Sequence, residues 1–169
     1  MLLAISILSY LVILGLLAML ARIDVREYIL PDRLNAALAI TFATFHITTG
    51  WKIISPPEAF WGGIAGLVFL LVIRHVANRF YKEDSLGLGD VKLVGAAGIG
   101  LGFPDIMLAL SLGSLFGLLH GGFMALQMRR HSGQPVSFSQ INVPAGLGLA
   151  AGIAIVMVVK FGFFWTGFT

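Results

Sequence analysis

Long apolar segments alternate with short polar stretches along the whole chain. The apolar segments cover residues 2–21, about 34–51, 59–77, 86–103, 106–128 and 143–165. A helix needs about 20 residues to cross the hydrocarbon layer of a membrane. The first and fifth segments reach this length easily, whereas the fourth carries Asp90 and Lys92 and has the weakest hydropathy signal. The pattern predicts an all-α membrane protein with six transmembrane helices in one bundle and residues 1–169 as a single domain.

Composition agrees with a membrane protein. Hydrophobic residues make up 58% of the chain and charged residues 11%, whereas soluble domains carry roughly 25% charged residues. The absence of cysteine excludes a disulfide, a thiolate nucleophile and cysteine-ligated zinc. The first segment is not expected to be a cleaved signal peptide, because no basic stretch follows Met1 and no small-residue cleavage site precedes Arg22.

The basic residues lie almost entirely on one side of the predicted bundle. With six spans, one side receives Arg22, Arg26, Arg33, Arg74, Arg79, Lys82, Lys92, Arg129 and Arg130, and the other receives Lys52 and Lys160. Cytoplasmic loops of membrane proteins are enriched in Lys and Arg. The N- and C-termini are therefore expected outside, and the loops 22–33, 78–90 and 129–142 in the cytoplasm. Trp51, Trp61 and Trp165 fall near the outer ends of their segments, as interfacial indoles do.

Two aspartates lie at the same predicted cytoplasmic boundary. Asp24 directly follows the first apolar segment, and Asp90 lies at the start of the fourth. Either one alone is more often a helix cap or an interfacial charge than a functional group. Two carboxyl groups brought together at membrane depth could share one proton and provide the acid and the base that peptide hydrolysis needs. Asp24 and Asp90 are therefore the candidate catalytic residues.

Glycines surround the second aspartate. Gly87 and Gly89 precede Asp90, and further glycines and alanines follow it. Small residues let membrane helices pack closely, so one interpretation is simply a tightly packed central helix. The other is that glycine beside a catalytic acid permits the close approach of a substrate backbone. Both roles are expected together.

Three motifs in this order resemble the type IV prepilin peptidases. Asp24 precedes Leu30-Pro31-Asp32 by several residues, Gly87-Leu88-Gly89-Asp90 is followed by Lys92, and Val143-Pro144-Ala145-Gly146 opens the last apolar segment. The Gly-x-Gly-Asp motif is shared with a wider class that includes archaeal preflagellin peptidases and presenilin-type proteases. The resemblance covers nearly the whole chain.

The resemblance implies an intramembrane aspartyl protease with Asp24 and Asp90 as the catalytic pair. Asp32 is the rival for Asp24, but members of the family often carry Asn there, and its position after Pro31 suits a helix start. Gly87, Gly89, Lys92, Pro31, Asp32, Pro144 and Gly146 would bind substrate or support the motifs. The implied location is the cytoplasmic membrane, with the active site facing the cytoplasm.

The resemblance also implies the substrate and the partners. Prepilin-like proteins carry a short basic leader that ends in Gly, followed by a hydrophobic helix. Membrane lipid is the expected surrounding, and no cofactor, metal ion or nucleic acid is expected. Full-length bacterial members also carry an N-terminal cytoplasmic region with paired cysteines, and they N-methylate the product. The chain contains no cysteine, so cleavage without methylation is expected.

Other polar residues admit simpler interpretations. His46 and His120 are expected to pack within helices rather than to bind metal, and Ser111 and Ser114 have no base nearby. Lys92 is expected either to reach the headgroups or to lower the pKa of a nearby carboxylate. Arg74 is expected to reach the headgroups, and Glu83-Asp84 forms either a solvated loop or a docking site for a basic leader.

Two rival functions remain open for the chain as a whole. One is a membrane transporter that uses Asp24 and Asp90 as a proton or cation site, although no inverted repeat is found. The other is a non-catalytic membrane anchor or pilus-assembly protein. The polar segments 78–90 and 129–142 are expected to be the most mobile.

Overall fold

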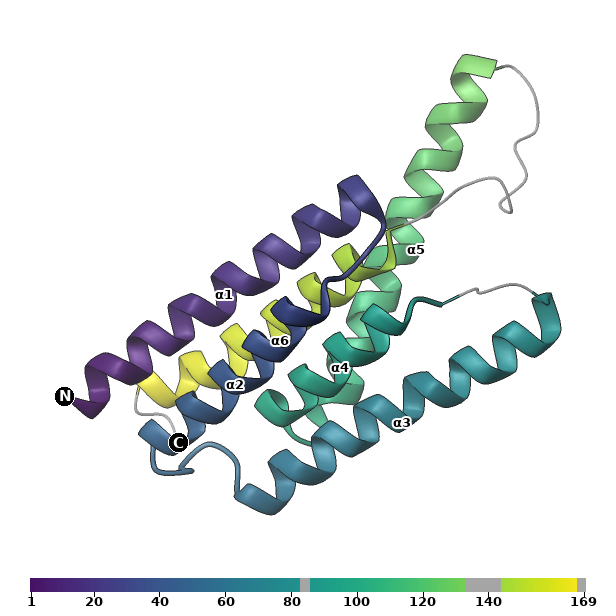
Figure 1. Ribbon diagram of the computed structural model, residues 1–169. Helices are drawn as coiled ribbons and strands as arrows, with labels where there is room; N and C mark the ends of the chain where they lie inside the picture. Colours follow the sequence, from purple (N-terminus) through teal and green to yellow (C-terminus); the bar gives the residue numbers. More distant parts are fainter. Residues whose placement is uncertain (83–85, 133–143, 167–169) are drawn as a thin grey trace.

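Six α-helices form one bundle in the computed structural model (Figure 1). The structure describes residues 1–82, 86–132 and 144–166. No strand occurs in these ranges, so the all-helical prediction is confirmed there. The helices are α1 (Leu2–Glu27), α2 (Asp32–Thr48), α3 (Pro56–Tyr81), α4 (Leu88–Leu101), α5 (Asp105–Ser132) and α6 (Ala145–Thr166).

The first helix is longer than its apolar segment. It continues through Arg22 and Asp24 to Glu27, and it ends where Tyr28 takes a left-handed conformation with φ 53°. Asp24 was expected to follow the apolar helix, but it lies in the last turn of α1. The reason is that charged residues such as Arg and Glu are good helix formers, so the helix ends at a backbone turn and not where hydrophobicity falls.

The short α4 is the centre of the bundle. It packs against α2, α3, α5 and α6, and nearly all of its side chains are buried. A helix that is apolar on all sides requires neighbours on all sides. The bundle therefore holds Asp90, near the first turn of α4, in a fixed position relative to four other helices.

Glycine contacts explain how α3 comes so close to α4. A Cβ added at Gly98 would lie 2.2 Å from the carbonyl oxygen of Gly62, and one added at Gly62 would lie 2.5 Å from that of Gly98. Gly100 leaves similar room for the ring of Phe42 on α2. Small residues of this kind let helix backbones approach closely in membranes. The predicted close packing of the glycine-rich fourth segment is confirmed.

Four of the six helices are long and apolar enough to cross a membrane within the described parts of the chain. These are α1, α3, residues Asp105–Met128 of α5 and residues Ala145–Gly162 of α6. The chain is thus a multi-pass membrane protein. With 17 and 14 residues, α2 and α4 are shorter, so six full crossings stay a prediction, as do the sides of the two termini.

Two expected loops are partly helical. α3 continues to Tyr81 and α5 to Ser132, and α4 begins at Leu88. The ends of the expected 78–90 loop and the start of the expected 129–142 loop are therefore helix, because polar residues extend helices whose apolar faces are already packed. Glu83, Asp84, His131 and the rest of the second loop, Arg129 and Arg130 included, have no described side chains.

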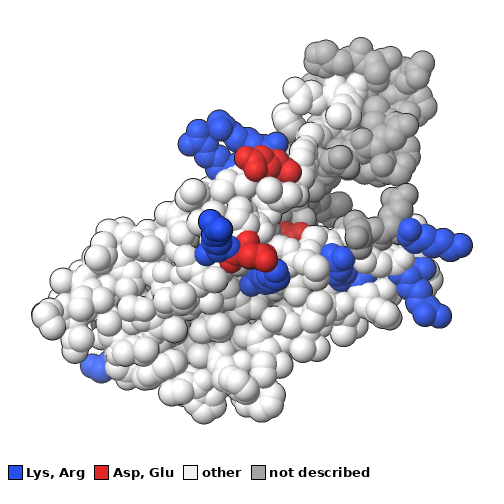
Figure 2. All heavy atoms as spheres, viewed as in Figure 1, with Lys and Arg blue, Asp and Glu red and all other residues white. Residues whose placement is uncertain are grey.

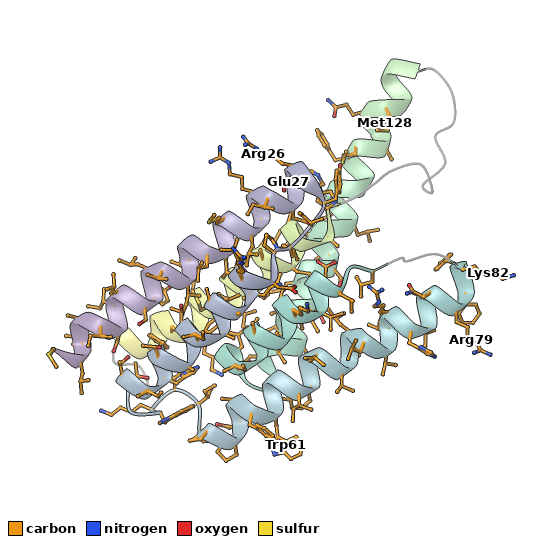
Figure 3. All side chains as sticks on the ribbon, viewed as in Figure 1. Arg26, Glu27, Trp61, Arg79, Lys82 and Met128 are labelled. Carbon is orange, nitrogen blue, oxygen red and sulfur yellow. The ribbon has the colours of Figure 1, made fainter. Side chains whose placement is uncertain are left out.

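Charged residues gather at one end of the bundle, which we call the basic end (Figure 2). In Figure 3, Arg26 and Glu27 of α1, Arg79 in the last turn of α3, Lys82 just beyond it, and Met128 of α5 lie toward this end, while Trp61 lies at the opposite end. Trp61 is 62% exposed, as an interfacial indole requires. The side chain of Trp165 lies outside the described residues.

Candidate active site

Asp24 lies at the basic end of α1 and faces the start of α6. Its side chain is buried, and its Oδ2 accepts a hydrogen bond of 2.9 Å from the backbone amide of Leu147. The amide of Gly146 also hydrogen-bonds to this carboxyl group. The first amides of a helix have no partner within the helix, and they attract a negative group. The start of α6 therefore fixes the orientation of the Asp24 carboxyl group.

Gly146 leaves the space in which that carboxyl group lies. A Cβ added at Gly146 would lie 2.8 Å from Cγ of Asp24 and 3.0 Å from Cδ1 of Leu30. Pro144, which is buried, comes just before the first residue of α6. The segment Pro144-Ala145-Gly146 thus places two backbone amides, those of Gly146 and Leu147, where they can bind the Asp24 carboxyl group, and Gly146 leaves room for that group.

Asp90 lies in the first turn of α4, where the sequence predicted it. It is only 8% exposed, and its Oδ1 has no hydrogen-bond partner among the described residues. The backbone amide of Gly87, the residue that caps α4, hydrogen-bonds to the carboxyl group. A Cβ added at Gly87 would lie 3.0 Å from Oδ2 of Asp90. One carboxyl oxygen of Asp90 thus accepts a hydrogen bond from the chain, and the other, Oδ1, has no partner among the described residues.

The two carboxyl groups lie close enough for the charge of Asp24 to act on Asp90. Leu30 lies beside both glycine motifs, since its Cβ would be 2.7 Å from a Cβ added at Gly89 and its Cδ1 3.0 Å from one added at Gly146. The structure therefore brings together the two aspartates that the sequence singled out, from helices that are remote in the chain.

Asp32 and Lys92 lie beside this pair and bind each other. Nζ of Lys92 is 2.6 Å from Oδ2 of Asp32, and the two side chains are 46% and 69% exposed. Asp32 is the first residue of α2 and follows Pro31, as expected. The structure thus gives Lys92 a carboxylate partner, Asp32, and its predicted roles stay predictions.

Three residues of this site were not singled out from the sequence. Leu30 lies between Gly89 of the Gly-x-Gly-Asp motif and Gly146 at the start of α6. The backbone amide of Leu147 donates a hydrogen bond to Asp24. Nδ2 of Asn35 donates one to the carbonyl oxygen of Gly89 at 3.1 Å. Asn35 is buried in α2, one helical turn after Asp32. A buried amide within an apolar segment is a signal that could have identified Asn35, because such a group requires hydrogen-bond partners.

Several other polar residues make hydrogen bonds or ring contacts within the bundle. Nε2 of the fully buried His46 lies 2.9 Å from the carbonyl oxygen of Gly100, and its ring stacks on Trp51. The hydroxyl of Ser111 donates to the carbonyl of Met107. Arg74 donates a hydrogen bond to the carbonyl of Leu86, and its contact with the headgroups stays a prediction. No group of three or more metal-ligating side chains occurs in the described part of the chain.

The arrangement can perform acid–base chemistry at a buried peptide bond. Two carboxyl groups that share one proton provide a base and an acid at the same place. The free oxygen of Asp90 can bind a water molecule or a carbonyl group. The site adjoins the basic end of the bundle, which a substrate segment can reach without crossing the apolar layer.

Comparison with known proteins identifies related sequences. The profile of the type IV leader peptidase family matches residues 11–122, which include Asp24 and Asp90. The motif at Pro144 lies beyond the matched range. No solved structure matches the chain.

Several curated relatives are each called "Prepilin leader peptidase/N-methyltransferase". The chain is 29% identical to the protein of Aeromonas hydrophila over 139 residues, which are 82% of this chain and 47% of that protein. It is 30% identical to the protein of Stutzerimonas stutzeri over 132 residues, or 78% of this chain and 45% of the relative. It is 31% identical to the protein of Escherichia coli (strain K12) over 111 residues, which are 66% of this chain and 48% of that protein. The chain spans about half the length of these relatives.

Proposed function

The chain belongs to the type IV leader peptidase family, and on that premise we propose that it is an aspartyl endopeptidase of the cytoplasmic membrane. Its substrates are prepilin-like proteins with a basic leader that ends in Gly and a hydrophobic helix behind it. The reaction is hydrolysis of the peptide bond after that Gly. The observation that carries this proposal is the buried pair of Asp24 and Asp90, in which Oδ1 of Asp90 has no partner among the described residues.

The chemistry follows from one proton shared between two carboxyl groups. The ionised carboxylate removes a proton from a water molecule, which attacks the carbonyl carbon of that Gly. The protonated partner donates its proton to the carbonyl oxygen. The tetrahedral intermediate then collapses, the C–N bond breaks, and the amine leaves with a proton from the pair. Asp24 and Asp90 suffice as acid and base, so the proposal includes no cofactor.

The surrounding residues position this pair. The amides of Gly146 and Leu147 hold the carboxyl group of Asp24, and the amide of Gly87 holds that of Asp90. A catalytic pair works only when both groups are held at the productive distance. Gly87, Gly89 and Gly146 act by leaving space, and Asn35 acts by holding the carbonyl group of Gly89.

The active site faces the cytoplasm in this proposal. Arg26, Arg79 and Lys82 lie at the same end of the bundle as the aspartates (Figure 3). Excess Lys and Arg mark the cytoplasmic side of membrane proteins. A leader peptide that has not crossed the membrane would meet the site there.

The test is a cleavage assay with the purified chain in detergent. The substrate is a prepilin-type peptide with a basic leader, a Gly and about 20 apolar residues. A single cut after the Gly, detected by mass spectrometry, is the expected result. If the peptide stays intact while proteoliposomes show an Asp24- and Asp90-dependent proton or cation flux, the chain is a transporter and the proposal is wrong.

Methylation is a separate matter, because the names of the relatives include an N-methyltransferase activity. We propose that the 169 residues cleave without methylating. The same assay tests this proposal when S-adenosylmethionine is added, since methylation would raise the mass of the released product by one methyl group. An unchanged product mass is the expected result.

A further inference from the structure

An apolar groove runs from the candidate active site along the side of the bundle. Its volume is about 480 Å³, and it lies between α3 on one side and α5 and α6 on the other. Phe69 and Ile73 of α3 and Leu118 of α5 line it, and they are 47%, 41% and 71% exposed. A groove this open and apolar has to be filled by lipid or by another apolar segment.

One end of the groove lies next to residues that border the catalytic pair, although neither aspartate lines the groove itself. The end of the groove that lies toward the basic end of the bundle, called its inner end below, is lined by Leu86 and Ala145. Each is followed directly by a glycine that borders one aspartate: Gly87 borders Asp90, and Gly146 borders Asp24. A segment lying in the groove would therefore have its inner end beside the two carboxyl groups.

Two glycines of α5 have open space beside them on the side of this groove. Gly117 and Gly122 both line it, and a Cβ added at either would meet nothing within 4 Å in the described structure. Gly113, one turn earlier, differs, because its Cβ would lie 2.9 Å from Cα of Leu149 on α6. Glycine in a membrane helix normally reflects the close approach of another backbone. On another side, α6 approaches Gly117, since a Cβ added at Gly148 would lie 3.0 Å from its backbone nitrogen. On the side of the groove, neither Gly117 nor Gly122 meets another part of the described chain.

A second groove provides the contrast. It has a volume of about 500 Å³ and lies between α2 and α3 over α4. Its glycines are explained by the chain itself, because a Cβ at Gly63 would lie 2.9 Å from the side chain of Ile99, and one at Gly95 would lie 3.3 Å from that of Leu67. The first residue of α4 that lines this second groove is Lys92, and Lys92 binds Asp32 and not the catalytic pair.

We infer that the groove between α3 and α5 receives the hydrophobic helix of the substrate, with the cleavage site at its inner end. This inference rests on the proposed function and adds the place and the direction of binding. The groove runs along α5 from Gly122 to Leu110, which is about 18 Å at 1.5 Å per residue. An apolar helix that begins just behind the cleaved bond matches this direction, because the groove leads away from the aspartates.

Photo-crosslinking tests the inference without relying on catalysis. A photoreactive amino acid is placed at Leu118 in the groove, at Ile64 in the second groove or at Leu11 on the exposed face of α1. Each protein carries Asp90→Asn and is mixed with the prepilin-type peptide. Strong crosslinking at Leu118 and weak crosslinking at the other two positions is expected. Equal yields, a higher yield at Ile64, or crosslinks from Leu118 only to lipid or to a second copy of the chain would overturn the inference.

A kinetic test uses the empty space beside Gly117. Gly117→Leu adds a side chain on the side of the groove, where its Cβ would meet nothing within 4 Å in the described structure. Gly15→Leu on α1 is the matched control because its added Cβ also meets nothing within 4 Å. We expect Gly117→Leu to raise KM for the helix-bearing peptide at least tenfold and to leave cleavage of a leader peptide without the helix unchanged. Equal effects of the two variants, or an equal loss on both peptides, would contradict the inference. Groove crosslinking without any cleavage would instead overturn the proposed function alone.

Discussion

Two groups of ionisable side chains at opposite ends of the bundle differ in the signs of their charges. At the end that carries Trp61, Nζ of Lys160 lies 2.5 Å from Oδ2 of Asp105 and 2.8 Å from the carbonyl oxygen of Leu101. At the basic end, Asp24 lies near a second carboxyl group, that of Asp90. One end thus joins α6 to the start of α5 through opposite charges, and the other end brings like charges together.

The difference separates a structural charge cluster from a functional one. Opposite charges near a membrane stabilise each other and can be explained by packing alone. Like charges with an unpartnered oxygen destabilise the fold, so some other property accounts for their presence. His46 also has an unpartnered ring nitrogen among the described residues, but it lies in an aromatic cluster with Phe45, Trp51 and Phe161. The ionisable group that acts on it is Lys160, which is itself paired with Asp105.

Exchange of a carboxyl group for an amide should affect the two ends differently. Asp90→Asn should lower the cleavage rate by at least about 10³-fold, equivalent to about 4 kcal/mol, because an amide cannot exchange the shared proton. Asp105→Asn is the matched variant at the other end. It should lower the thermal stability slightly and leave the cleavage rate of the folded protein unchanged. A fall in cleavage of the same size for both variants would remove the distinction.

Loss of the space beside Asp24 should have the next largest effect. Gly146→Ala places a Cβ within 2.8 Å of Cγ of Asp24, so the carboxyl group has to move and the rate should fall about 10- to 100-fold. Gly15→Ala adds the same atom in open space and should change nothing. Steady-state cleavage measured beside a melting curve separates a displaced carboxyl group from an unfolded protein. Full activity of Gly146→Ala would show that the position of Asp24 is less restricted than the structure indicates.

Removal of the link between α2 and the Gly-x-Gly-Asp turn should have a smaller effect. Asn35→Ala deletes the hydrogen bond to the carbonyl oxygen of Gly89, which is worth about 1 kcal/mol. We expect roughly a fivefold lower cleavage rate. Thr41→Ala removes a hydrogen bond within α2, to the carbonyl of Ala37, and should leave the rate unchanged. If both variants lower the rate equally, Asn35 has no particular role in positioning Asp90.

The exposed ion pair should matter least. Lys92→Gln breaks the contact with Asp32, and exposed ion pairs contribute about 0–1 kcal/mol. The cleavage rate should change by about twofold or less, and the change should disappear at high salt because the pair is screened. A loss above about tenfold that persists in high salt would place Lys92 among the catalytic residues.

Much of the fold could be predicted because hydrophobicity reports directly on membrane helices. The six apolar segments became six helices, and the charge of Asp90 in an otherwise apolar segment marked its position. The ends of the helices were harder to predict from the sequence. α1 passes through Asp24 and ends at Tyr28, since a left-handed backbone turn and not a fall in hydropathy stops it.

The candidate site could be predicted only in part. The two aspartates were found because charges at membrane depth are rare. The partners Leu147 and Asn35 were not, since backbone amides leave no mark in a sequence and a single Asn does not say which carbonyl group it holds. The partner of Lys92 was also unpredictable, because Asp32 and Lys92 are 60 positions apart.

The central claim is that Asp24, and not Asp32, completes the pair with Asp90. The most direct test is to measure cleavage of the prepilin-type peptide by Asp24→Asn and Asp32→Asn side by side. Asp24→Asn should be inactive while remaining folded and membrane-inserted. Asp32→Asn should keep most of the activity, because its side chain is exposed at the start of α2. An inactive Asp32→Asn beside an active Asp24→Asn would contradict the assignment, and full activity of both would contradict the pair itself.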